Sequence, residues 1–120
     1  MYPVCFLALC HCQSWLHFVS AGLAITEPGG GSDVANIQTT AKLSECGKFY
    51  IVNGSKTFSS GGMKADYFTT GCKTTEDGGH GGLSLLLIER TMPGVKCTRL
   101  KTQGWWISNT TTIAFEDVTR

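Results

Sequence analysis

The chain has 120 residues, of which 42% are hydrophobic and 16% are charged, and its formal net charge is +1. That length accommodates one domain at most, and the composition is that of a folded globular protein. The ten basic residues are spread along the chain, which argues against a nucleic-acid partner, because a phosphate-binding face shows clustered Lys and Arg.

Residues 1–21 combine an apolar run at 6–10 with small residues at 19–21. Small residues of this kind are cleaved by signal peptidase, but no basic region precedes the apolar run, which polar residues soon follow. A membrane span needs about 18 uninterrupted apolar residues, and a mitochondrial transit peptide needs Arg, which this segment lacks. We therefore expect no membrane span and no convincing targeting signal here, with a secretory signal as the alternative.

Six cysteines, at positions 5, 10, 12, 46, 72 and 97, form no C-x-x-C pair. Cys10-His11-Cys12 could supply metal ligands, but adjacent residues chelate poorly and no second cluster follows, so we expect no metal site. Free thiols in a reducing or organellar compartment fit this spacing better than disulfides. A secreted β-sandwich with disulfides is the alternative.

An apolar run at residues 23–25 predicts a strand that ends at Pro28, which has no N–H to donate to a sheet. Gly29, Gly30 and Gly31 follow. Consecutive glycines can take positive φ values and form an anion-binding nest, and a plain glycine-rich turn is the alternative. Their order fits neither G-x-G-x-x-G nor a P-loop.

Further strands are expected at residues 38–43, 49–52 and 55–58. Asn53-Gly54 joins the last two and predicts a hairpin, because type I′ turns need positive φ at both central positions. Four more strands are expected at 66–71, 83–89, 95–100 and 110–115, with a flexible loop at 74–82. About seven strands at regular spacing predict an all-β fold, a small antiparallel β-barrel or sandwich.

Several ordered motifs resemble the acyl-CoA dehydrogenase family. They are ITEPGGGSD at 25–33, the segment 53–67 that begins NGSKTFSSGG, TMPGV at 91–95, GWWISNT at 104–110 and FEDV at 115–118. The resemblance covers residues 22–120 and implies the middle β-domain of these flavoenzymes, which is normally set between two helical domains. Residues 1–21 do not match and are interpreted as a separate N-terminal segment.

The resemblance implies FAD as the cofactor. One flavin-binding segment would comprise Leu23, Ala24, Ile25, Thr26, Gly31 and Ser32, and the second Phe58, Ser59 and Ser60. Thr26 would bond the pyrimidine end of the flavin through its hydroxyl and N–H, because donors there stabilise the charge that builds up on reduction. Phe58 stands where relatives usually have Trp and would pack on the flavin, and Ser60 replaces the usual Thr that bonds N5.

Ser32 and His80 are the expected contacts to the acyl-CoA substrate. The residues alone favour the ordinary interpretations, in which Thr26 is a strand threonine, Phe58 a core residue and His80 a solvated loop residue. Trp105 and Trp106 are expected at a domain or subunit interface. Glu116 and Asp117 are expected at the surface.

The resemblance implies a proton-abstracting Glu from a C-terminal helical domain that this sequence does not include, and it gives Glu27 no such role. No catalytic residue is therefore expected in this chain. The expected function is FAD-dependent oxidation of an acyl-CoA to a 2-enoyl-CoA, with this chain as the flavin- and substrate-facing β-domain. A non-catalytic truncated isoform that acts as an interaction domain is the alternative.

The same resemblance implies electron-transferring flavoprotein as the electron acceptor. It also implies a homo-oligomer for the full-length enzyme, and a mitochondrial matrix or other intracellular location.

Overall fold

The computed structural model describes residues 19–75 and 79–120. These residues contain seven strands: β1 (Ala21–Ala24), β2 (Thr40–Leu43), β3 (Tyr50–Ser59), β4 (Tyr67–Lys73), β5 (Leu83–Glu89), β6 (Val95–Arg99) and β7 (Thr111–Thr119). Three 3-10 helices connect them: η1 (Val34–Asn36), η2 (Gly79–Gly82) and η3 (Trp106–Ser108). The all-β expectation is confirmed. The expectations for residues 1–18, including the Cys10-His11-Cys12 cluster, lie outside the described residues.

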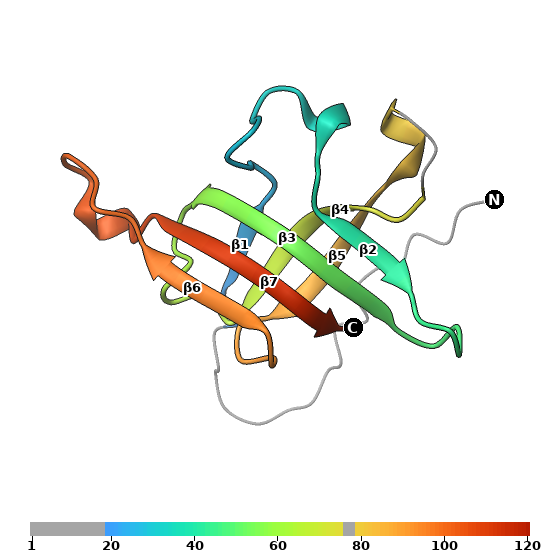
Figure 1. Ribbon diagram of the computed structural model, residues 1–120. Coiled ribbons are helices and arrows are strands. Elements are labelled where there is room, and N and C mark those ends of the chain that lie inside the picture. Colours follow the sequence, from blue (N-terminus) through green and yellow to red (C-terminus); the bar gives the residue numbers. More distant parts are fainter. Residues whose placement is uncertain (1–18, 76–78) are drawn as a thin grey trace.

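The seven strands form one sheet in the order β1-β4-β2-β3-β7-β6, with β5 paired to β4. The sheet curls, so that β3, β7 and β6 lie across the front of Figure 1 with β1, β4 and β5 behind them. The β1–β4 and β2–β4 pairs are parallel, whereas the other pairs are antiparallel. Both β1 and β2 run parallel to β4 and pair with it one after the other, and residues 25–39 connect these two strands.

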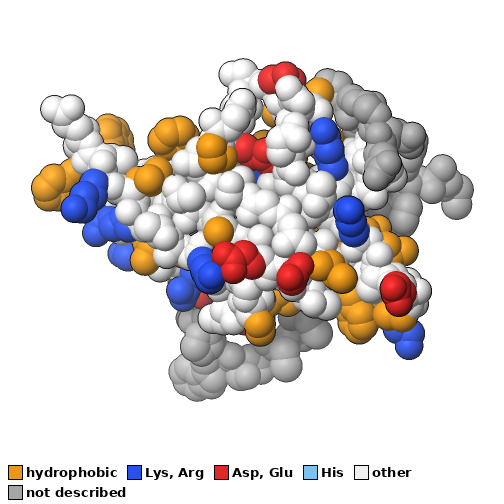
Figure 2. Space-filling model, in the orientation of Figure 1, with side chains coloured by type: hydrophobic (Ala, Val, Ile, Leu, Met, Phe, Trp, Pro, Cys, Tyr) orange, Lys and Arg blue, Asp and Glu red, His pale blue; other side chains and the backbone are white. Residues whose placement is uncertain are grey.

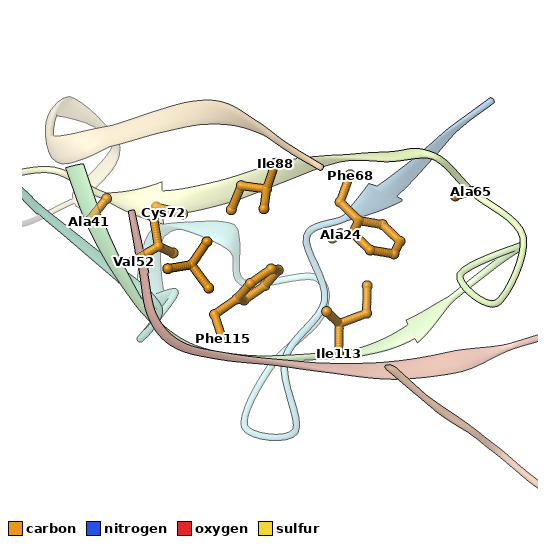
Figure 3. Close-up of a cluster of buried hydrophobic side chains, with 10 residues drawn as sticks. Ala24, Ala41, Val52, Ala65, Phe68, Cys72, Ile88, Ile113 and Phe115 are labelled. Carbon is orange, nitrogen blue, oxygen red and sulfur yellow. The ribbon is translucent and has the colours of Figure 1, made fainter. Parts of the chain in front are cut away.

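The core lies inside this curl. Val52, Phe68, Ile88 and Ile113 are fully buried, and Figure 3 shows their side chains pointing toward one another from opposite walls of the sheet. Each such side chain contributes about 1.5–3 kcal/mol through burial of apolar surface. Alternation is clearest in β1, where Gly22 and Ala24 are buried and Ala21 and Leu23 are exposed, whereas three consecutive residues of β4, Thr70 to Cys72, are buried.

The predicted hairpin at Asn53-Gly54 is wrong, because β3 runs through this dipeptide. The register against β7 shifts between Val52 and Gly54, and the Asn53 amide exchanges two 2.9 Å hydrogen bonds with Asp117. Gly54 does take a positive φ of 147°, but within a β-bulge. A Cβ there would lie 2.6 Å from Thr39 Oγ1, so the glycine lets the chain before β2 approach β3 closely.

The glycine nest is also absent from the segment that the structure describes at residues 27–31. Glu27 and Gly30 exchange backbone hydrogen bonds of 3.0 and 3.1 Å and close a tight turn. None of Gly29, Gly30 and Gly31 has a positive φ. The plain turn, the alternative interpretation, is the observed one.

Other boundaries agree closely with expectation. The strand expected at 83–89 is β5, whereas β7 continues to Thr119, beyond the expected end at 115. Within the described ranges, no helix is long and apolar enough to cross a membrane.

Candidate functional site

The structure brings the two segments expected to bind the cofactor side by side. The Thr57 N–H donates to the Thr26 carbonyl oxygen at 2.8 Å. The Ser59 hydroxyl donates to the Leu23 carbonyl oxygen, also at 2.8 Å, across 36 positions of sequence. The end of β1 and the end of β3 therefore form one continuous edge, which we call the 23–26/57–60 edge.

Side chains on this edge divide between the core and the surface. Ala24 and Ser59 are buried, whereas Leu23 and Phe58 are about two-thirds exposed, at 64% and 66%. Phe58 also has a φ of 56°, in the left-handed region that a bulky residue rarely adopts. A strained backbone that presents an aromatic ring to the surface is typical of ligand-binding sites.

Thr26 lies half-buried between the two segments, beside Ile25. Within the described residues, neither its N–H nor its hydroxyl makes a hydrogen bond, although its carbonyl oxygen does. Gly31 covers it closely, since a Cβ at Gly31 would lie 3.3 Å from Thr26 Cγ2. Two donors next to an exposed aromatic ring suit a planar group that carries hydrogen-bond acceptors at its rim.

The residues expected to touch the substrate lie beyond this edge. Ser32 is exposed in the turn before η1, and His80 lies in η2. The two 3-10 helices contact each other at one end of the molecule, at the top of Figure 1. Ser32 thus lies two residues before a 3-10 helix that contacts the one containing His80.

An apolar groove of about 230 Å³ adjoins Ile25. Ile37, Leu83 and Leu85 line it together with Val34, Ser84 and Gly71. A Cβ at Gly71 would lie 3.1 Å from Ile25 Cδ1, so the glycine keeps Ile25 seated against β4.

A buried ion pair, not identified from the sequence, involves Glu27, the residue after Thr26. Lys56 Nζ is 2.8 Å from Glu27 Oε1, and the two side chains are 0% and 7% exposed. Glu27 also accepts hydrogen bonds from the backbone N–H groups of Gln38 and Thr39 and from the Thr39 hydroxyl. In the sequence, the only indication of this ion pair is that both residues fall within the family motifs.

Opposing effects act on the pKa of the Glu27 carboxyl. Burial raises it, but the hydrogen bonds from Lys56, Thr39 and Gln38 together outweigh burial and hold the pKa below its ordinary value. The carboxylate is therefore ionised and saturated with donors at neutral pH, which makes it a poor proton acceptor.

The cysteines of the described part of the chain, Cys46, Cys72 and Cys97, are free. Burial raises the pKa of the Cys72 thiol to about 11, although Lys56 nearby favours the thiolate. Cys72 is thus a core side chain with an unreactive thiol.

The connection between β6 and β7 projects beside the end of β3, where the Gly61 N–H donates to the Ser108 carbonyl oxygen at 2.6 Å. Trp105, Trp106 and Ile107 are 84%, 70% and 86% exposed, and Figure 2 shows hydrophobic side chains beside basic ones at this tip. The Trp106 indole donates to the Thr102 carbonyl oxygen, so the tip is ordered by its own contacts. Its expected place at an interface stays a prediction.

Comparison with known proteins gives a consistent family. A family model for the acyl-CoA dehydrogenase middle domain matches residues 22–118. The chain is 47% identical over 97 residues to the acyl-CoA dehydrogenase apdG of Emericella nidulans, covering 80% of this chain and 22% of that protein. It is 40% identical over 100 residues to the mitochondrial isobutyryl-CoA dehydrogenase of Bos taurus, covering 81% of this chain and 23% of that one.

Solved structures agree. A probable acyl-CoA dehydrogenase from Mycobacterium abscessus superposes with a TM-score of 0.79 at 44% identity, over 83% of this chain and 26% of that one. An acyl-CoA dehydrogenase from Bacillus anthracis, complexed with FAD, superposes with a TM-score of 0.73 at 35% identity, over 82% of this chain and 16% of that one.

This chain thus spans about a quarter or less of the length of the relatives that it matches. Both the sequence match and the structural match fall on the same curled sheet. The chain therefore belongs to the acyl-CoA dehydrogenase family, and its residues 22–118 correspond to the middle domain.

Proposed function

We propose that this chain supplies the flavin- and substrate-facing β-domain of an FAD-dependent acyl-CoA dehydrogenase, which oxidises an acyl-CoA to a 2-enoyl-CoA. The observation that carries the proposal is the 23–26/57–60 edge, where the Thr26 donors have no partner among the described residues and the exposed Phe58 has a strained backbone. A relative with the same fold was solved in complex with FAD, which supports the choice of cofactor.

In this proposal the N–H and hydroxyl of Thr26 bond the pyrimidine end of the flavin. Phe58 packs on the ring, the Ser60 hydroxyl bonds N5, and the remaining contacts come from Leu23, Ala24, Ile25, Gly31, Ser32 and Ser59. When bound, the flavin accepts the hydride that leaves the β-carbon of the substrate. Donors fixed at the pyrimidine end favour that transfer, because negative charge develops there.

We place the proton-abstracting carboxylate outside residues 22–118. Glu27 is nearest to the edge, but its oxygens accept four hydrogen bonds, and its lowered pKa is far from that of an effective general base at neutral pH. The complete enzyme would then need another part of the protein for its chemistry.

Ser32 and His80 are the proposed contacts to the CoA thioester. Electron-transferring flavoprotein is the proposed electron acceptor, and a homo-oligomer the proposed assembly of the complete enzyme. A mitochondrial matrix or other intracellular location is consistent with the mitochondrial relative from Bos taurus.

The test is the visible absorption spectrum of the purified 120-residue chain after incubation with FAD and removal of the excess. We expect the parent chain to retain a flavin band, and Thr26→Val and Phe58→Ala to lose most of it. Phe49→Ala is the matched control, because Phe49 is also a partly exposed aromatic residue, 46% exposed, outside the edge. Equal retention by all three variants would contradict the proposed edge.

Turnover distinguishes the enzyme from the alternative, a non-catalytic interaction domain. An acyl-CoA and an artificial electron acceptor are added to the FAD-loaded chain. We expect no turnover by this chain alone, because the base is placed elsewhere. A parent chain that retains no flavin at all would favour the interaction domain.

A further inference from the structure

We propose that Glu27 and Lys56 are positioning residues for Thr26, because their buried ion pair fixes the main chain on both sides of it. The inference rests on the proposed function, in which Thr26 binds the flavin. Neither side chain is proposed to touch the cofactor or the substrate.

Lys56 holds the residues that flank Thr26. Its ammonium donates to the Ile25 carbonyl oxygen at 3.0 Å and to Glu27 Oε1 at 2.8 Å. The next residue of β3, Thr57, donates its N–H to the carbonyl oxygen of Thr26 itself. Three consecutive residues, 25 to 27, are thus held by two consecutive residues of β3.

Glu27 connects this arrangement to the chain before β2. Its Oε2 accepts the Gln38 N–H at 2.7 Å, and its Oε1 accepts the Thr39 N–H and hydroxyl at 2.9 and 2.6 Å. The tight turn at residues 27–30 therefore cannot shift without breaking hydrogen bonds to two separate segments. Because Thr26 directly precedes this turn, the same hydrogen bonds restrict its main chain.

The kind of contact points to positioning rather than to stability alone. Of the three bonds between β3 and residues 23–26, two are made by the side chains of Lys56 and Ser59. A regular strand pair would also engage N–H groups of both chains. Here side chains occupy the carbonyl oxygens of Leu23 and Ile25, and the Thr26 N–H has no partner among the described residues.

The burial of two charges strengthens this argument. A well-packed apolar pair of similar volume often stabilises a fold as well as a buried ion pair does. An apolar pair could not bond the Ile25 carbonyl oxygen or the N–H groups of Gln38 and Thr39. What the charges provide is the geometry of residues 25–27.

The first test needs no flavin. Amide hydrogen exchange is measured on the 120-residue chain and on Glu27→Gln, which keeps the side-chain volume. We expect exchange at the Thr57 amide to accelerate about tenfold, whereas the Leu100 amide, bonded to Thr110 in the β6–β7 region, keeps its rate. Equal acceleration at both amides would show a purely stabilising role and overturn the proposal.

Two further variants serve as a control and as a second test of the same link. Lys96→Met removes one partner of the exposed Lys96–Glu116 pair and should leave the Thr57 amide unchanged. Thr39→Val removes one donor to Glu27 and keeps the ion pair, so it tests the same link if Glu27→Gln does not fold. We expect it to accelerate Thr57 exchange about two- to threefold, and an unchanged Thr57 rate in Thr39→Val would overturn the proposal.

The second test measures FAD affinity by absorption titration. We expect Glu27→Gln to raise the Kd about tenfold and to change the shape of the bound flavin band, with Lys96→Met equal to the parent. If the parent binds FAD and Glu27→Gln binds it equally well, positioning fails and the proposed function stands. If the parent binds no FAD, the proposed function fails for this chain, and hydrogen exchange still decides positioning.

Discussion

Two ion pairs in this protein have nearly the same length but opposite surroundings. Lys56 and Glu27 are 2.8 Å apart with side chains 0% and 7% exposed, whereas Lys96 and Glu116 are 2.7 Å apart with side chains 65% and 61% exposed. The buried pair connects β3 to the turn after β1 and to the chain before β2. The exposed pair joins β6 and β7, which already pair along their length.

The difference teaches that distance alone does not measure the importance of an ion pair. In water the attraction between exposed charges is screened, and the lost side-chain entropy offsets most of it. In the core, each charge depends on its partner, because no water is present to solvate a charge whose partner has been removed. The buried Lys56–Glu27 pair therefore holds its region in place, whereas the exposed Lys96–Glu116 pair adds little to the stability of β6 and β7.

Breaking the buried pair should have the largest effect. We expect Lys56→Met to lower the free energy of unfolding by about 3–5 kcal/mol, because it leaves the Glu27 charge buried without its cation. Urea unfolding followed by circular dichroism measures this. The double variant Glu27→Leu/Lys56→Met should recover part of the loss, since it removes both charges. A loss below about 1 kcal/mol in Lys56→Met alone would contradict the importance of the buried pair.

The close approach that brings Thr39 to Glu27 gives the next effect. Gly54→Ala places a Cβ 2.6 Å from Thr39 Oγ1 and 2.7 Å from Thr39 Cα, at a φ of 147°. We expect a loss of about 1–3 kcal/mol, because backbone must shift to relieve the overlap. Gly29→Ala is the control, with no atom within 4 Å of its Cβ. Equal melting temperatures for the two variants would contradict this interpretation.

Acid should weaken the region of the buried pair as pH falls below the ordinary pKa of Glu27. The pKa of Glu27 is lowered in the fold from an ordinary value of 4.5, so its stabilising contribution is fully present above about pH 4.5 and is lost as pH falls through the lower folded value. Urea unfolding between pH 6 and about pH 3 measures this loss.

Glu27→Gln serves as the comparison for the acid experiment, and it should flatten this part of the profile. Asp66 acts in the same range, because the Ser20 N–H and hydroxyl lower the pKa of that carboxyl. The difference between parent and variant isolates Glu27. A Glu27→Gln profile as steep as that of the parent would contradict this prediction.

The exposed pair should give the smallest effect. We expect Lys96→Met to change the free energy of unfolding by about 0–1 kcal/mol. The change should vanish in about 1 M salt, where the screening length falls to about 3 Å. A loss comparable to that of Lys56→Met would mean that exposure does not govern these pairs.

Much of the fold followed from the sequence. Alternation and β-branched residues located the strands, with β5 found at its observed bounds. The resemblance to the acyl-CoA dehydrogenases implied that Thr26 and Phe58 belong to one site, and the structure places their segments side by side. Local patterns suffice to locate strands because strand propensity is a property of neighbouring residues.

Tertiary structure decided what those patterns left open. Asn53-Gly54 signals a positive φ, but whether the chain reverses or bulges depended on β7 lying alongside, where Asp117 bonds Asn53. Glu27 and Lys56 are 29 positions apart, and only the curl of the sheet makes them partners. A charged residue carries no sign of its burial in its own sequence neighbourhood, because burial is set by strands distant along the chain.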